Sequence, residues 1–208
     1  GVIEGTTNAE DGQVLEFAAR PAPELVRPAE PQWAESIELF NGMDLTGWKV
    51  RSEELPNNWR AVDGVLENTE AGTDLQTEQV FDDFRLELEF KYPEGSNSGI
   101  YLRGRYEVQI QDDIGKEPDS LYIGGVYGFL TPSVNAARPA GEWQSYDITL
   151  LGREVTVVLN GVTVIDQQEI PGITGGALDG REDEPGPILL QGDHGPISFR
   201  NIQLTPAR

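Results

Sequence analysis

Short stretches in which apolar and polar residues alternate strictly constrain the fold of this 208-residue chain more than any other feature. The clearest stretch runs from Phe84 to Phe90, where apolar residues alternate with Arg85, Glu87 and Glu89. Successive side chains of a β-strand point to opposite faces, so this pattern predicts a strand with one buried face. A helix would need apolar residues three and four positions apart, and this stretch does not have them.

Turn signals separate similar short runs along the chain. Asp63-Gly64 and Asn160-Gly161 each lie between two apolar-rich runs and predict tight hairpins, because both turn positions tolerate a positive φ. Two further strands are predicted at residues 146–151 and 197–204, and no stretch predicts a helix of three turns. The sequence therefore predicts an all-β fold, in which two antiparallel sheets pack as a jelly-roll sandwich.

The first 36 residues have a different composition, rich in Ala, Pro and Glu. Closely spaced prolines exclude a long regular element there, and a short strand is predicted only at residues 14–17. The prolines concerned are Pro21, Pro23, Pro28 and Pro31. We expect residues 1–36 to form an extended arm and residues 37–208 to form the jelly-roll domain.

The charge balance excludes several classes of partner. There are 36 acidic and 15 basic residues, which gives a formal net charge of −21. Nucleic acids and anionic membranes would be repelled by such a protein. No apolar run approaches the ~20 residues of a membrane span, so membrane insertion is not expected. The chain has no Cys, which excludes disulfides and thiolate chemistry, and its oligomeric state is not defined by the sequence.

Residues 97–112 combine an apolar face with a polar face suited to a ligand. A hairpin with Gly104, Arg105 and Tyr106 in its loop would pair Arg103 with Glu107, Tyr101 with Gln109, and Ile100 with Ile110. Tyr, Arg, Glu and Gln would then share one surface, as a polar ligand such as a sugar requires. The alternative is an ordinary solvated sheet face.

Glu107 and Asp112 are candidates for acid and base catalysis on this hairpin. Strict alternation places them on opposite faces, so a β-bulge would be needed to bring them together. Without a bulge, Asp113 would point the same way as Glu107. The alternative is an acidic strand end that leads into a loop.

His194 is the only histidine, in the sequence L-L-Q-G-D-H-G after a predicted strand. Imidazole titrates near neutrality and can exchange a proton with a substrate, although a single histidine is ordinarily structural. Gly192 and Gly195 predict an unusual backbone turn around it, and Gln191 precedes the turn on the same face.

Aromatic residues offer stacking surfaces for sugars. We expect most of Trp33, Trp48, Trp59 and Trp143 to pack in the core. Tyr127, in G-G-V-Y-G, has glycine neighbours that allow a ligand to approach closely, and is the better candidate for stacking. The alternative for Tyr127 is a loop residue without a role.

No motif predicts a cofactor. The acidic loop, residues 179–184 (D-G-R-E-D-E), has oxygen ligands suited to Ca²⁺ but lacks EF-hand spacing, so we interpret it as solvated. Phosphate-binding glycine loops, zinc-protease motifs and serine-hydrolase elbows are missing from the sequence.

An ordered series of motifs between residues 37 and 206 resembles the 3-keto-disaccharide hydrolase family, which has a concanavalin-like jelly-roll fold. The series comprises L-F-N-G-M-D-L-T-G-W (39–48), W-R-A-V-D-G-V-L (59–66), L-Q-T (75–77), D-F-R-L-E-L-E-F (83–90), N-S-G-I-Y-L-R (97–103), Y-E-V-Q-I-Q-D (106–112), G-E-W-Q-S-Y-D-I (141–148), L-N-G (159–161) and L-Q-G-D-H-G-P-I-S-F-R-N-I (190–202).

The resemblance implies a carbohydrate substrate already oxidised at sugar C3, and an exported bacterial protein. A C3 ketone acidifies the C2 hydrogen, so a base could remove it, the C1 substituent could leave, and water could then add. Glu107 or His194 would be the base, with the other or Asp112 as the acid, and Arg103 would stabilise the enolate. Tyr101, Gln109, Tyr127 and Gln191 would position the sugar. A metal could polarise the ketone in place of Arg103.

Three other functions fit the same sequence. A non-catalytic carbohydrate-binding jelly roll needs the aromatic and amide side chains but no base. A retaining glucanase needs two carboxylates ~5 Å apart; in the comparable glucanase motif E-x-D-x-x-E, this chain has Gln109 as the middle residue. A structural domain would need no ligand site at all.

Overall fold

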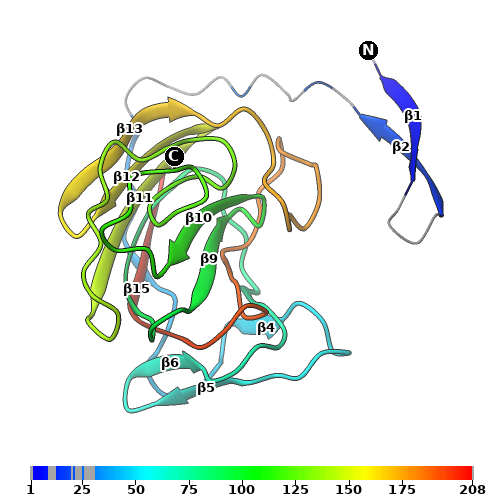
Figure 1. Cartoon of the computed structure of the whole chain (residues 1–208). Helices are drawn as coiled ribbons and strands as arrows, with labels where there is room; N and C mark the ends of the chain where they lie inside the picture. Colours follow the sequence, from blue (N-terminus) through cyan, green and yellow to red (C-terminus); the bar gives the residue numbers. More distant parts are fainter. Residues whose placement is uncertain (1, 9–12, 20, 22–24, 26–30, 208) are drawn as a thin grey trace.

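The computed structural model describes residues 2–8, 13–19, 21, 25 and 31–207, and its body is a sandwich of two antiparallel sheets (Figure 1). The prediction of an all-β jelly-roll sandwich is confirmed. The larger sheet has the strand order β13-β12-β11-β8-β15-β6-β5, with β3 paired to β15. Its strands are β3 (Ile37–Glu38), β5 (Trp59–Val62), β6 (Val65–Asn68), β8 (Phe84–Lys91), β11 (Gln144–Leu151), β12 (Glu154–Leu159), β13 (Val162–Glu169) and β15 (Ile197–Pro206).

The smaller sheet lies in front of the larger one in Figure 1 and has the order β10-β9-β14-β7-β4. Its strands are β4 (Trp48–Val50), β7 (Leu75–Thr77), β9 (Asn97–Leu102), β10 (Tyr106–Gln111) and β14 (Leu189–Leu190). Because β14 comes from near the end of the chain and pairs with both β9 and β7, it brings the residues that follow it next to the β9–β10 hairpin.

Alternation in the sequence becomes burial in the structure. Every second residue of β8, from Phe84 to Phe90, is buried, while Arg85, Glu87 and Glu89 lie on the outer face. β8 pairs with β11 on one side and β15 on the other, so it lies inside the larger sheet. The inward side chains of both sheets form one continuous core, whose burial is the main favourable contribution to folding.

The tight hairpins are confirmed. Asp63 and Gly64 join β5 to β6 with φ values of 50° and 80°, and Asn160 and Gly161 join β12 to β13 with φ values of 52° and 81°. Both turn positions therefore adopt the left-handed region that these residue types tolerate.

Two of the four tryptophans pack in the core, fewer than expected. Trp48 and Trp59 are buried in the core. Trp143 lies against the guanidinium of Arg200, whose carbon is 4.0 Å from the ring centroid, and Trp33 is partly exposed and bridges to Ala207. None of the four lines the pocket described below.

The N-terminal residues form a separate two-stranded sheet of β1 (Ile3–Asn8) and β2 (Val14–Ala19). The strand predicted at residues 14–17 is therefore present and longer than expected. Of the predicted arm, residues 1, 9–12, 20, 22–24 and 26–30 lie outside the described residues, and the domain boundary at residue 36 stays a prediction. The described part of the chain contains no helix long and apolar enough to cross a membrane.

Candidate active site

The β9–β10 hairpin has a different register from the one predicted. Leu102 pairs with Tyr106, and Glu107 pairs with Tyr101, so the three-residue turn is Arg103-Gly104-Arg105. The prediction that paired Arg103 with Glu107 is wrong by two residues. Because side chains alternate with period two, a shift of two leaves each strand residue on its predicted face, and Tyr101, Glu107 and Gln109 still share one face.

Arg103 does not join that face, which corrects its predicted role as the group that stabilises an enolate. It occupies the turn with a φ of 52°, and its side chain is completely buried. The guanidinium donates to the Gly152 carbonyl at 2.6 Å and forms an ion pair with Asp82 at 3.1 Å. Every one of these contacts is structural, and Arg103 does not line the pocket.

Asp112 is also outside the pocket. The pairing of β9 with β10 is continuous from Tyr106 to Gln111, so there is no bulge to turn Asp112 toward Glu107. Its carboxylate instead accepts from the Gly95 backbone N–H at 2.9 Å. Asp113 lies beyond the end of β10, where it is buried and accepts from the Ile123 N–H at 2.9 Å. Neither aspartate lines the pocket.

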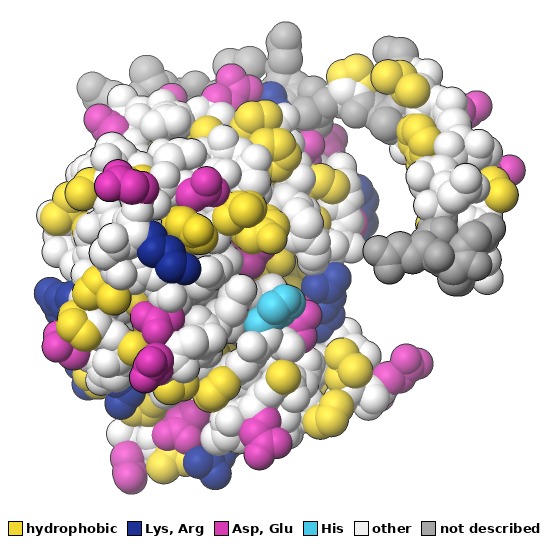
Figure 2. Space-filling view, in the orientation of Figure 1, with side chains coloured by type: hydrophobic (Ala, Val, Ile, Leu, Met, Phe, Trp, Pro, Cys, Tyr) yellow, Lys and Arg dark blue, Asp and Glu magenta, His cyan; other side chains and the backbone are white. Residues whose placement is uncertain are grey.

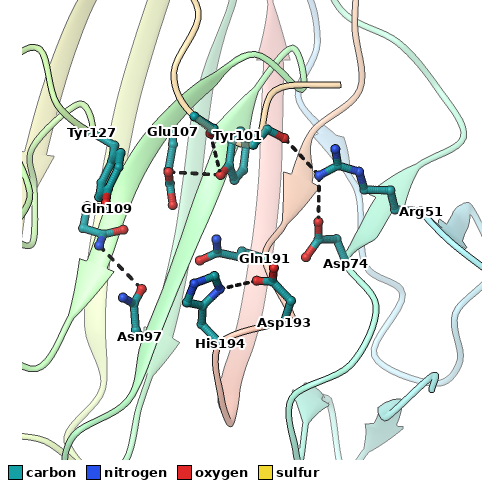
Figure 3. Close-up of a pocket in the computed structure, with 12 residues that line it drawn as sticks. Arg51, Asp74, Asn97, Tyr101, Glu107, Gln109, Tyr127, Gln191, Asp193 and His194 are labelled. Atoms are coloured by element: carbon teal, nitrogen blue, oxygen red, sulfur yellow. Dashed lines mark hydrogen bonds and ion pairs between the residues drawn. The ribbon is translucent and has the colours of Figure 1, made fainter. Parts of the chain in front are cut away.

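Six of the eight predicted site residues do meet in one pocket of about 190 Å³ on the outer face of the smaller sheet (Figure 3). Core-facing Ile100 and Val108 alternate with the pocket residues along β9 and β10, which explains why the polar side chains point outward. The predicted residues in the pocket are Tyr101, Glu107, Gln109, Tyr127, Gln191 and His194. The pocket is also lined by Arg51, Asp74, Asn97, Gly175, Gly176 and Asp193.

Glu107 is the most unusual of these residues, because it is 4% exposed and its carboxylate forms no ion pair among the described residues. Burial raises its pKa to about 7, although a hydrogen bond from the Tyr101 hydroxyl at 3.0 Å and the nearby His194 act in the opposite direction. Gly99 makes room for it, since a Cβ there would collide with the carboxylate. A carboxyl with a pKa near neutrality can both accept and donate a proton.

His194 lies at the open side of the pocket, with its side chain 51% exposed, and Figure 2 shows the histidine ring at the surface. Nδ1 contacts the carboxylate of Asp193. Such a contact orients the ring and leaves Nε2 as the nitrogen available to a substrate.

The turn that carries His194 is held at both ends. The Asn68 amide donates to the carbonyls of Gly192 at 2.9 Å and Gly195 at 3.1 Å. Gly192 has no room for a side chain, because a Cβ would collide with the Thr73 carbonyl. The glycines on either side of the histidine therefore have the structural role that the sequence indicated.

Arg51 and Asp74 form the opposite wall, and the sequence gave no signal for Arg51. Arg51 donates to Asp74 at 3.0 Å and to the Gly176 carbonyl at 2.9 Å. Asp74 also accepts from the Gly192 N–H at 2.9 Å. A cation is thus present in the pocket, but it comes from the segment after β4 and not from the hairpin. Asp74 directly precedes the L-Q-T motif, which is the only signal that could have found it.

The amide side chains offer hydrogen bonds to a polar ligand. Gln191 is 8% exposed, and its Oε1 has no partner among the described residues. Gln109 donates to Gln111 at 3.2 Å; in the other orientation of its amide it donates to Glu107 Oε1 at 3.2 Å. A buried acceptor without a partner costs free energy unless a ligand satisfies it.

The acidic loop is mostly exposed, as predicted, but two of its acids are bound to the hairpin. Asp179 accepts from Arg105 at 2.8 Å, and buried Glu182 accepts from the Tyr106 hydroxyl at 2.7 Å. These acids bind the tip of the hairpin, while backbone hydrogen bonds from Thr174 to Arg105 and from Leu178 to Gly104 hold the segment that carries Gly175 and Gly176. Within the described ranges, no group of three potential ligand residues is arranged to hold a metal ion.

Comparison with known proteins gives a consistent result. The model of the 3-keto-alpha-glucoside-1,2-lyase-like domain matches residues 35–205. A Bacteroides thetaiotaomicron protein named 3-keto-disaccharide hydrolase is 30% identical over 167 residues, covering 62% of this chain and 57% of the relative. This chain therefore spans just over half the length of that relative.

Solved structures share the fold. A candidate glycosyl hydrolase from Parabacteroides distasonis superposes with a TM-score of 0.67 at 32% identity, covering 89% of this chain and 92% of the other. LamA from Z. galactanivorans, crystallised with laminaritriose and laminaritetraose, has a TM-score of 0.52 at 14% identity, covering 85% of this chain and 98% of the other. The second likeness concerns the fold alone.

Proposed function

Since the chain belongs to the family of 3-keto-α-glucoside-1,2-lyase-like domains, we propose that it cleaves glycosides whose sugar carries a ketone at C3. The observation that supports this proposal most directly is the buried carboxyl of Glu107, which has a pKa of about 7 and no ion-pair partner among the described residues. A carboxylate desolvated in this way is a stronger base than one in water, and a carbon acid needs such a base.

The first step is the removal of the C2 hydrogen by Glu107. The electron pair of the C2–H bond forms the C2=C3 double bond of an enolate, and the negative charge moves to the ketone oxygen. Arg51 is the cation of the pocket and takes the stabilising role that the sequence assigned to Arg103. Glu107 leaves this step as a neutral carboxylic acid.

In the second step the enolate collapses and the C1–O bond breaks. In this proposal His194 protonates the departing oxygen through Nε2, since Nδ1 is in contact with Asp193. The product is a 1,2-unsaturated 3-keto sugar, and addition of water across C1 and C2 gives the hydrolysed sugar. Asn97, Gln109 and Gln191 bind hydroxyl groups, and the ring of Tyr127 covers one end of the sugar.

An ordinary retaining glucanase is less well supported. Its mechanism requires two carboxylates ~5 Å apart. At the positions of the glucanase motif this chain has Glu107, Gln109 and Asp112, and Asp112 is outside the pocket. β10 therefore contributes one carboxylate, that of Glu107, to the pocket, and not the pair that this mechanism needs. No feature of the pocket favours a binding module over an enzyme, since binding alone does not require a buried base.

The test uses matched glycosides with and without a 3-keto group. We expect release of the aglycone from the keto form only, with solvent deuterium incorporated at C2 when the reaction is run in D₂O. H194A should slow release of poor leaving groups by about 100-fold and of phenolate-type leaving groups much less, because the latter need no acid. Binding of the keto sugar without turnover would contradict the proposal and leave the carbohydrate-binding function.

A further inference from the structure

We propose that Tyr101 is a positioning residue whose single hydroxyl proton moves between two hydrogen bonds, one to Glu107 and one to Gly175, as Glu107 loses or gains its proton. This inference rests on the proposed function in one respect, the role of Glu107 as the base. It concerns how the protein keeps that base in place through a change of charge.

The hydrogen-bond inventory around Tyr101 gives the first reason. Its hydroxyl oxygen lies 3.0 Å from Glu107 Oε2 and 3.0 Å from the Gly175 carbonyl oxygen. An ionised carboxylate and a carbonyl are both acceptors, whereas a tyrosine hydroxyl has one proton to donate. When Glu107 is ionised, Tyr101 therefore serves only one of the two acceptors.

Protonation of Glu107 removes this shortage. The neutral carboxyl has an O–H that donates to the Tyr101 oxygen, and the Tyr101 O–H is then free to donate to Gly175. All three oxygens are satisfied in that state. The direction of both hydrogen bonds thus depends on the proton of Glu107, while the oxygen atoms stay where they are.

The surroundings hold the tyrosine in place. Its side chain is buried in the wall of the pocket. Gly176 follows Gly175 with a φ of 76°, and a Cβ at this position would collide with the Tyr101 hydroxyl. The carbonyl of Gly176 is in turn fixed by Arg51 at 2.9 Å. Reorientation of the proton is therefore the response that the packing permits.

The other charged groups that face Glu107 have partners of their own. Asp74, next to β7, is bound to Arg51 and to the Gly192 N–H. Asp193, after β14, contacts His194. Both acids raise the pKa of Glu107 and His194 lowers it, but burial contributes most. Among the described residues, none of these charged groups forms a hydrogen bond with Glu107 Oε2, whereas the Tyr101 hydroxyl does, and it can therefore respond to the proton of Glu107.

The arrangement suits a base that must return to its starting state. As Glu107 takes the C2 proton, Tyr101 becomes an acceptor from it and a donor to Gly175, so the carboxyl is hydrogen-bonded before and after the transfer. Y101F keeps the aromatic ring and removes the hydroxyl, and with it this relay, the shift of the hydroxyl proton between Glu107 and Gly175. We expect it to raise the pKa of Glu107 by about one unit, a tenfold change in its ionisation equilibrium, because the Tyr101 hydrogen bond lowers this pKa on balance in the wild type. We also expect kcat to fall about 30-fold with KM nearly unchanged.

The experiment follows Glu107 without substrate. Protein labelled with ¹³C at the glutamate carboxyls is titrated by NMR, and E107Q identifies the Glu107 signal. In parallel, hydrogen exchange of residues 174–178 is measured across the same pH range, corrected for intrinsic rates. In the wild type we expect exchange of this segment to increase as Glu107 ionises, and in Y101F we expect it to be fast at every pH.

Y106F is the matched control, because Tyr106 donates to the buried carboxylate of Glu182 at the other side of the same hairpin. It should lower stability similarly and leave the Glu107 titration unchanged. An unchanged Glu107 midpoint in Y101F would overturn the proposal, as would pH-independent exchange of residues 174–178 in the wild type. If the titration behaves as expected but no 3-keto glycoside is cleaved, the relay stands and the proposed function fails.

Discussion

Charged groups are buried in two regions of the β9–β10 hairpin, its tip and its pocket face, and the two regions differ in the partners that these groups have. At the tip, Arg105 is paired with Asp179, Arg103 with Asp82, and Tyr106 bonds Glu182. On the pocket face, Glu107 has no cation partner among the described residues and accepts from a neutral hydroxyl. Asp82 and Asp179 also keep 46% and 27% of their side chains exposed, whereas Glu107 is 4% exposed. A counter-charge and access to water together therefore distinguish these ion-paired acids from Glu107.

The contrast appears in the direction of the pKa shifts. Burial acts to raise the pKa of Asp179, but hydrogen bonds from Arg105 and Arg181 hold it well below its usual value. Glu107 has no such compensation, and its pKa is about 7. Ionisation of Asp179 at the tip therefore stabilises the folded protein, whereas ionisation of Glu107 in the pocket destabilises it.

E107Q tests this comparison with the largest expected effect. Removal of the base should lower kcat for a 3-keto glycoside by about 1,000-fold, within the range usual for general-base catalysis, while the protein stays folded. D112N is the matched control just beyond the other end of β10, because Asp112 lies outside the pocket, and should keep activity within about threefold. Comparable losses in both variants would contradict the placement of the site.

R103M should act on stability and not on chemistry. The variant leaves the buried Gly152 carbonyl without the Arg103 donor and removes the ion pair to the half-exposed Asp82. We therefore expect unfolding to become easier by about 2 kcal/mol, measured by urea denaturation. At a temperature where it is folded, kcat should stay within about threefold of the wild type. R103K, which restores the charge, should recover part of the stability. A large fall in kcat with normal stability would instead support a role for Arg103 in catalysis.

Glu107 should also make the stability of the protein depend on pH. Its pKa rises from 4.5 in the unfolded chain to about 7 in the folded protein, so the folded state binds more protons between these values and stability falls as pH rises. The free energy of unfolding of E107Q minus that of the wild type should therefore increase with pH. Between pH ~4 and a pH above ~7 we expect this difference to increase by up to about 3 kcal/mol. Denaturation at several pH values checks this, and a constant difference would mean that Glu107 is not desolvated.

Asp179, in the loop that contacts the tip of this hairpin, should show a pH dependence of opposite sign. Its pKa is lowered on folding, so its contribution is present at neutral pH and is lost as pH falls below its unfolded value of 3.8. D179N should therefore be less stable than the wild type at pH 7 and approach it in acid. A difference that persists unchanged at the lowest accessible pH would show that the Arg105 ion pair contributes little.

The smallest expected effect concerns Asp193. D193N should lower kcat about tenfold, because the ring of His194 loses the carboxylate that orients it. The exposed acid of the acidic loop, Asp183, provides a control, and D183N should have no effect. An equal response of the two variants would mean that Asp193 acts only through the general negative charge of the surface.

The sequence alone was sufficient for the parts that depend on local periodicity. Alternation with period two determines which residues of a strand share a face, so Tyr101, Glu107 and Gln109 came together even though the predicted register was wrong by two positions. The same rule excluded Asp112 unless a bulge intervened. The glycines around His194 likewise indicated a special turn from composition alone.

Tertiary structure decided what depends on contacts between distant segments. Arg51 reaches the pocket from the segment after β4, and backbone hydrogen bonds to the hairpin turn hold the segment with Gly175 and Gly176 at the pocket. The three-residue turn took Arg103 out of the strand and into the interior. The pKa of Glu107 also belongs to this class, because desolvation is produced by every element packed around the carboxyl. Periodicity fixes the direction in which a side chain points, and only the packed chain determines which groups it meets there.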